Sequence, residues 1–374
     1  MQQFNITELI NKSLKPENVG YVLLQGNVPV TSITRLTENL IFEGAFVGYK
    51  DGAILQLDKD GNFISKSRRE HQDEVTHLKH YKDHYFNKEF IISGDSQGAV
   101  WRWELVGRGY RLREPSSPVI SLDVDGFNQG ISSQIVLSAH VNGEIVVYSG
   151  TRPQSWSYFD DDSSTNRLVW AGIVSESTIL GIDNGGGWRI WDFEGKPKKP
   201  GQGQLPDANP ITTVSRKENN LVIGHRSGYW KSFTFDAGKM KFLGDGKVKS
   251  GAVQLVDYRV HTDRETGDNV HLIVTSDEDN NIQVWSEDGE DQWSVNGDPH
   301  HKITALHLIS RKVVISAHED GSVVLWNEGK VRDLQELTRR SCEVVRNSHI
   351  DSDSDATIKI DLNAFREAKS FCDR

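Results

Sequence analysis

The chain has 374 residues, of which 36% are hydrophobic, and it contains ten Trp, 33 Gly and only two Met. This composition is typical of a soluble protein rich in strands and turns and argues against a helical bundle. The formal net charge of -10 provides no general attraction to a phosphate backbone, so nucleic acid is not an expected partner.

The amino terminus, MQQFNITELINKSLKP, lacks the basic and then apolar layout of a secretion signal. The sequence also lacks a run of about 18 apolar residues, so we expect a cytoplasmic protein with no membrane contact. The two cysteines, Cys342 and Cys372, are too few for a disulfide scaffold. We expect no cofactor and no metal.

One phrase, a turn followed by a short strand, recurs seven times along the chain. The copies are KDGAILQL ending at Leu57, SQGAVWRW at Trp103, VNGEIVVY at Tyr148, NGGGWRIW at Trp191, RSGYWKSF at Phe233, EDNNIQVW at Trp285 and GSVVLW at Trp326. Five residues before each end, one register holds Gly52, Gly98, Gly143, Gly186, Gly228, Asn280 and Gly321. These residue types accept positive φ at low cost, which predicts a tight hairpin turn in every copy.

Each copy follows a short strand such as IVLSA or VVISA, and usually a further one such as VISLDV. Successive copies end 41 to 52 residues apart, and the longest interval holds a polar insertion at residues 261–269. A period of about 40 to 45 residues with four short strands is typical of a β-propeller blade. We therefore predict an all-β, seven-bladed β-propeller of four-stranded blades over residues 20–329.

An open propeller would leave exposed sheet edges, so the way in which the ring closes matters. The segment GYVLLQGNV, residues 20–28, precedes the first blade just as fourth strands precede the later blades. We predict that this N-terminal strand completes blade seven beside VVLW, with residues 1–19 as an N-terminal extension.

The period and the phrase resemble the WD40-repeat family over roughly residues 20–329. The Trp-Asp pair of that family occurs once, at Trp191 and Asp192, and its Gly-His element is matched best by Glu70 and His71 before Val75. The resemblance implies a propeller that binds proteins. Because the Gly-His element is degraded, the family's hydrogen-bonded tetrad is not expected in most blades.

Residues 330–374 change to helical spacing, as in LQELTRRSCEVVRNS and DLNAFREAKSF, and predict a short helical C-terminal tail. This tail could dock on its own propeller or on a partner. Between the two segments, DSDSDATIKIDL resembles a calcium loop but has Ala356 in place of the turn glycine and Leu362 in place of the glutamate. The cluster of His77, His80, Asp83 and His84 resembles zinc ligands, but we interpret it as a surface loop.

Three residues before the turn glycine or asparagine, the seven blades carry Tyr49, Asp95, His140, Asp183, His225, Asp277 and His318. Equivalent positions in a propeller lie on one face, so these residues are our candidates for partner binding. The alternative is that each caps its own turn by hydrogen bonding to the local backbone. Since histidine changes its charge near neutral pH, the candidates also suggest a pH-sensitive partner surface.

The sequence shows no nucleophile elbow and no phosphate loop, so a catalytic role is not expected. The leading hypothesis is a non-catalytic protein interaction scaffold or recognition subunit of an intracellular complex, which binds protein partners through loops on one propeller face. One alternative is a ligand or protein sensor module of a signalling system. Another is a metal-dependent hydrolase or lactonase that uses the Asp and His residues. The sequence leaves the oligomeric state open.

Overall fold

The computed structural model describes residues 19–328, except for 39–40, 60, 65–69, 84–87, 106–108, 115, 125–134, 150–151, 160–165, 207–208, 237, 263–268 and 298–300. The described residues form strands and connecting turns, and the strands group into seven separate sheets. The predicted all-β, seven-bladed β-propeller is therefore confirmed.

In every blade except the seventh, the strands lie side by side in sequence order. Blade one has β2 (Val30–Glu38), β3 (Ile41–Tyr49) and β4 (Ile54–Asp58). Blade two has β5 (Val75–Asp83), β6 (Lys88–Asp95), β7 (Val100–Glu104) and β8 (Gly109–Arg113). Blade three has β9 (Val119–Val124), β10 (Val136–His140), β11 (Glu144–Ser149) and β12 (Arg152–Ser157). Blade four has β13 (Leu168–Ser175), β14 (Thr178–Asp183), β15 (Gly187–Trp191) and β16 (Pro197–Gln204).

The remaining three blades have four strands each. Blade five has β17 (Ile211–Lys217), β18 (Asn220–His225), β19 (Tyr229–Asp236) and β20 (Lys239–Lys247). Blade six has β21 (Val253–Thr262), β22 (Asn269–Asp277), β23 (Ile282–Ser286) and β24 (Asp291–Val295). Blade seven has β25 (Ile303–Ser310), β26 (Val313–His318) and β27 (Ser322–Asn327), together with β1 (Val19–Gln25).

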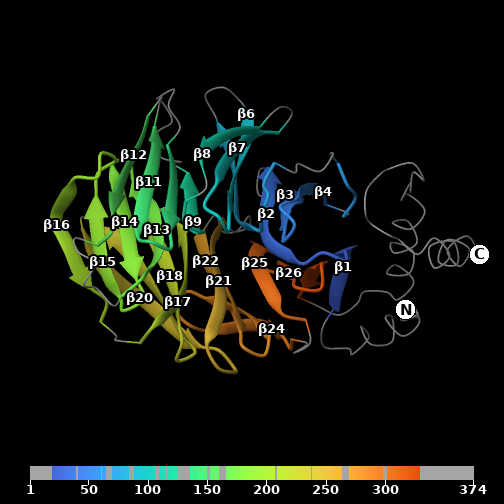
Figure 1. Ribbon diagram of the computed structural model, residues 1–374. Helices are drawn as coiled ribbons and strands as arrows, with labels where there is room; N and C mark the ends of the chain where they lie inside the picture. Colours follow the sequence, from blue (N-terminus) through green and yellow to red (C-terminus); the bar gives the residue numbers. More distant parts are fainter. Residues whose placement is uncertain are drawn as a thin grey trace, which may run out of the picture.

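The first strands of adjacent blades contact one another around the whole ring, from β2 through β25 and back to β2. They therefore line the propeller axis, and the chain colours in Figure 1 run once around it. Apolar side chains pack between neighbouring blades; one core, for example, joins Trp170 and Ile182 of blade four to Leu221 and Phe233 of blade five.

The ring closes through its N-terminal strand, as predicted. β1 pairs antiparallel with β27, with Gly20 opposite Trp326 and Gln25 opposite Ser322. In Figure 1, β1 lies beside the C-terminal strands of blade seven. A core that contains Val30 and Val47 of blade one and Ile315 of blade seven seals the joint between the first and last blades.

In blade one, the described residues form three strands. After β4, the Gly61 N–H donates to the Asp58 carbonyl at 3.1 Å, and Phe63 forms an isolated bridge with Leu57 before the described residues are interrupted at 65–69. Phe63 and Ile64 are about half exposed there, at 52% and 54%.

All seven turn positions have positive φ, from 61° at Asn280 to 94° at Gly98. At Gly98, a Cβ atom would lie only 2.2 Å from the Ser117 carbonyl oxygen, so glycine is required there for space as well as for φ. The hairpin turns read from the repeat are therefore confirmed at every copy.

Threonine hydroxyl groups connect neighbouring blades near the start of the inner strands. The hydroxyl of Thr31 donates a hydrogen bond of 2.8 Å to the Val75 carbonyl, and that of Thr212 donates one of 2.6 Å to the Val253 carbonyl. The hydroxyl of Thr304 reaches the Val30 carbonyl at 2.6 Å and so crosses the closing joint. These bonds fix the rotation of one blade against the next.

Some expectations fall on residues outside the described part. These are the N-terminal extension before residue 19, the helical tail, the calcium-like segment and both cysteines. Within the described residues, no helix is long and apolar enough to span a membrane.

Candidate functional site

The seven candidate residues stand at one structural position, the last residue of the second strand in each blade. The structure thus places all seven on the same face of the ring, but their side chains are buried. The exposed fractions run from 0% for His140 and Asp277 to 7% for Asp183. Direct contact of these side chains with a partner stays a prediction.

The three aspartates hold the following turn in place. Asp95 Oδ1 accepts hydrogen bonds from the backbone N–H groups of Gln97 and Ala99, at 3.0 and 2.8 Å. Asp183 and Asp277 accept the equivalent pairs of bonds. The interpretation that these residues cap their own turns is confirmed for the aspartates.

In blade two, Asp95 also belongs to a buried network of four side chains. Its Oδ2 lies 2.7 Å from His71 Nδ1, and His71 Nε2 lies 2.6 Å from Ser93 Oγ. Trp103 Nε1–H donates to the same Ser93 oxygen at 2.7 Å. One assignment satisfies every group: Nδ1–H of neutral His71 donates to Asp95, and Nε2 accepts the Ser93 proton.

In blades three and seven, one histidine at the candidate position takes the place of both Asp95 and His71. His318 Nε2 accepts from Ser316 Oγ at 2.7 Å, while Nδ1 lies 3.1 Å from the His301 carbonyl. Trp326 Nε1–H donates to the same Ser316 oxygen at 2.8 Å. His140 and Ser138 repeat this arrangement in blade three, with the Tyr148 hydroxyl in place of the Trp.

Burial moves the pKa of two candidate histidines, His140 and His225, away from neutral pH. Burial lowers the pKa of His140 and of His225, although a backbone carbonyl opposes the shift in each case. Both side chains are therefore neutral at pH 7, and they gain charge only in more acidic solution.

Hydroxyl residues that were not expected from the sequence join these networks. Ser93, Ser138 and Ser316 each stand two residues before the candidate Asp or His and bond the aromatic residue that ends the repeat. Thr275 does the same with Trp285 in blade six. The signal was a Ser or Thr at this fixed offset in the otherwise apolar second strands.

The residues available to a partner are the tips of the capped turns. We call the turns after the second strands, together with the connections between blades, the turn face. Its exposed tip residues are Lys50, Asp51, Gln97, Val141, Asn142, Arg226, Ser227, Glu278, Asp279 and Glu319. The tips on the adjacent blades six, seven and one are mainly acidic.

The zinc-like cluster is part of a strand and not the loop that we expected. His77 and His80 lie within β5, and His84 lies outside the described residues. His80 contacts Glu89 at 3.2 Å, whereas burial and the charge of Lys79 lower the pKa of His77 to about 4. In the described ranges, no group of three or more His, Cys, Asp and Glu residues could hold a metal ion.

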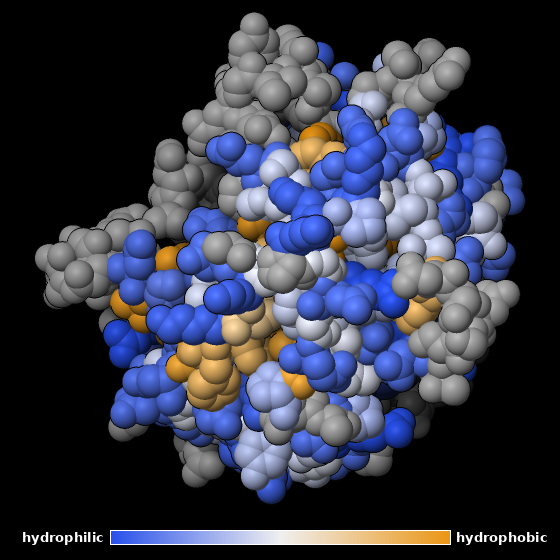
Figure 2. All heavy atoms as spheres, turned by 90° about the vertical axis from the view of Figure 1, so that its left-hand side faces the viewer, coloured by the Kyte–Doolittle hydropathy of each residue, from blue (hydrophilic) through white to orange (hydrophobic). Residues whose placement is uncertain are grey.

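Two tryptophans on outer strands, Trp156 of β12 and Trp293 of β24, contact the next blade along the chain. Trp156 lies against Trp191, with ring centroids 6.2 Å apart, and Trp293 Nε1–H donates to the Arg311 carbonyl. The side of the ring formed by β15, β16 and β20 is mostly hydrophilic, with separate apolar areas (Figure 2). It carries a shallow pocket of about 390 Å³ lined by Tyr158, Arg189 and Gln204 among others.

Comparison with known proteins supports the fold. No protein-family model matches the chain, and no curated protein matches its sequence. Among solved structures, it is similar to the crystal structure of the computationally designed Ika8 protein, with a TM-score of 0.53 and 19% identity. That similarity covers 82% of this chain and 98% of the designed chain. At this identity, the likeness concerns the fold alone.

Proposed function

We propose that this chain is a non-catalytic, cytoplasmic interaction scaffold or recognition subunit that binds a protein partner through the turn face. The observation that carries the proposal is that buried side chains cap the turns by hydrogen bonds to the turn backbone. Buried Asp side chains fix the turn backbone in three blades, while tip residues around the ring remain exposed. A rigid set of loops loses little conformational entropy on binding, which favours recognition.

The network of His71, Asp95, Ser93 and Trp103 supports a WD40-like character for the propeller. It is the kind of tetrad that the resemblance implied, and its successive hydrogen bonds are 2.6 to 2.7 Å long. Protein binding in an intracellular complex is the function that this likeness suggests.

The charge of the tips suggests the chemistry of the partner. Asp51, Glu278, Asp279, Glu319 and Asp320 cluster on three adjacent blades, with Lys50 as the basic residue among those tips. Complementary charge guides encounter and sets specificity in protein complexes. The proposed partner therefore presents a basic surface to blades six, seven and one.

Affinity purification with mass spectrometry tests the proposal. The intact chain is compared with a charge-reversed variant, Glu278→Lys, Asp279→Lys and Glu319→Lys. The control reverses three exposed acids at turns of the opposite face, Glu176→Lys, Asp236→Lys and Glu290→Lys. We expect a protein retained by the intact chain and the control and lost by the turn-face variant. Retention by all three, or loss from both variants, would contradict the proposal.

A further inference from the structure

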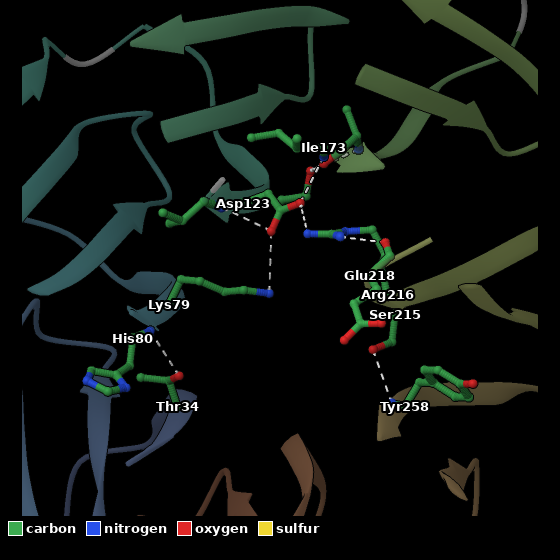
Figure 3. Close-up of polar contacts among 12 residues, drawn as sticks. Thr34, Lys79, His80, Asp123, Ile173, Ser215, Arg216, Glu218 and Tyr258 are labelled. Atoms are coloured by element: carbon green, nitrogen blue, oxygen red, sulfur yellow. Dashed lines mark hydrogen bonds and ion pairs between the residues drawn. The ribbon is translucent and has the colours of Figure 1, made fainter. Parts of the chain in front are cut away.

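Near the propeller axis, basic side chains gather on the inner strands, away from the turn face. They are Arg35 on β2, Lys79 on β5, Arg216 and Lys217 at the end of β17, and Arg259 on β21. They come from four different blades, although the chain as a whole carries a net charge of -10. Figure 3 shows the side chains of Lys79 and Arg216 both reaching Asp123.

The acidic residues of this region are already occupied by donors. Asp123 Oδ2 accepts from Arg216 at 2.6 Å and from the Ile173 N–H at 2.9 Å. Its Oδ1 accepts from the Val124 N–H at 3.0 Å and lies 3.8 Å from Lys79 Nζ. Because a carboxylate offers about four acceptor positions, Asp123 has none left for another cation.

Asp257 is occupied in the same way. Its Oδ2 accepts from Arg35 at 3.0 Å and from the Leu308 N–H at 2.9 Å, and lies 3.3 Å from His307 Nδ1. Ser215 donates to its Oδ1 at 3.3 Å. The remaining acid nearby is Glu218, whose charge acts on Lys217. Five basic residues thus face three acidic ones among the described residues of this region.

Within the described part of the chain, Arg259 and Lys217 form no ion pair with a carboxylate, although the charges of Asp257 and Glu218 act on them. Arg259 is 4% exposed and donates to the Leu308 carbonyl at 3.2 Å. Arg35 donates to that same carbonyl at 2.7 Å, so two guanidinium groups share one acceptor. Lys217, at the end of the inner strand β17, keeps solvent-accessible surface.

The like charges are close enough to affect one another. Burial and the charge of Arg35 lower the pKa of Arg259 to about 10. Partial desolvation lowers the pKa of Lys217, and the charges of Arg35, Arg216 and Lys79 act in the same direction. An added anion would remove this repulsion.

We propose that these axial cations form a binding site for a phosphate group, supplied by inorganic phosphate or by a phosphorylated small molecule. Guanidinium groups bind phosphate through paired, charge-assisted hydrogen bonds, and ammonium groups add compact positive charge. Lys79 and Lys217 remain accessible to an incoming ligand, whereas Arg35 and Arg259 form its more buried side. This site is separate from the turn face and independent of its partner.

The test is calorimetric titration of the full chain with inorganic phosphate, tripolyphosphate and citrate at constant ionic strength. We expect binding of phosphate and tighter binding of tripolyphosphate, with citrate weaker than tripolyphosphate. Lys79→Gln and Lys217→Gln should each weaken tripolyphosphate binding by about tenfold or more, because each removes a charge-assisted contact. Lys217→Arg, which keeps the charge, should retain binding.

The matched control is Lys302→Gln, which removes an exposed lysine of the turn face, in the connection between blades six and seven. It should change the affinity less than about twofold, since a distant surface charge is screened. The proposal is overturned if neither phosphate nor tripolyphosphate binds, or if citrate binds as tightly as tripolyphosphate. Equal affinity losses in Lys302→Gln and Lys217→Gln would also overturn it, because binding would then follow total charge.

Discussion

Ser93 has two partners in the buried network of blade two, since it donates to His71 and accepts from Trp103. The sequence predicted the positions of Asp95 and Trp103 because the repeat fixes their register. It did not predict the role of Ser93, because a small hydroxyl within an apolar strand gives no periodic signal of its own. Its function depends on the approach of His71, which lies 22 residues earlier in the chain.

We expect Ser93→Ala to lower the free energy of unfolding by about 2 to 4 kcal/mol. The change leaves two buried polar groups, one on His71 and one on Trp103, without their partner. Chemical denaturation measures the effect. Ser155→Ala, on an exposed part of β12, is the control and should stay within about 0.5 kcal/mol of the wild type. A similar small change for both variants would show that the network contributes little.

Gly98 has a φ of 94°, and its backbone lies close to Ser117, so both its conformation and its surroundings disfavour a side chain. Gly98→Ala should cost more than about 2 kcal/mol, from backbone strain and from the clash with the carbonyl. Thermal and chemical unfolding would give the value. Gly201→Ala serves as the comparison, because a Cβ atom at this position would lie 3.1 Å from its nearest neighbour, the Lys198 carbonyl oxygen. Comparable losses at the two positions would contradict the turn geometry.

Strands were predictable where repetition and alternation agree. The closing strand β1 was recognised from its place before blade one, and it pairs with β27 as expected. The sequence did not show how blade one continues after β4, where the described residues form the isolated bridge between Leu57 and Phe63, because the turn before this bridge has the usual residues. The stretch around His77 and His80 does not look like a strand in the sequence. Polar side chains of an inner strand break the usual alternation of apolar and polar residues, so we expected a loop where β5 forms.

Removal of residues 1–28 tests the closing strand. The loss of β1 exposes β27 and removes Leu23, Leu24 and Val28 from the core at the closing joint. We expect the free energy of unfolding to fall by at least about 3 kcal/mol, with aggregation on heating. A chain that lacks only residues 1–18 keeps β1 and serves as the control. Equal melting temperatures for the two truncated chains would contradict closure by β1.

For the whole molecule, the seven-blade ring followed from the repeat, whereas the electrostatics of its interior did not. The sequence could not show that Arg35 and Arg259 meet at one carbonyl, because they come from blades one and six. Nor could it show that the candidate Asp and His side chains are buried under their turns. Both facts depend on how the blades pack around the axis.

Stability should fall as the solution is acidified from pH 7 to pH 5. The folded chain holds the pKa of His77 at about 4 through burial and the charge of Lys79, whereas the unfolded value is about 6.5. The unfolded state therefore binds the proton first, and His77 alone costs about 2 kcal/mol by pH 5. The melting temperature measured across this range should decrease, and His77→Gln should weaken the dependence. A flat profile, or the same slope in the variant, would refute this origin.

The central claim is that a protein partner binds the turn face. Photo-crosslinking amino acids placed singly at Gln97, Ser227 and Asp320 sample its tips, and those at Glu176, Asp236 and Glu290 sample the opposite face. After irradiation in cells and purification, we predict that one protein is crosslinked from at least one turn-face position and from none on the opposite face. Crosslinks to that protein only from the opposite face, or equally from both, would contradict the account.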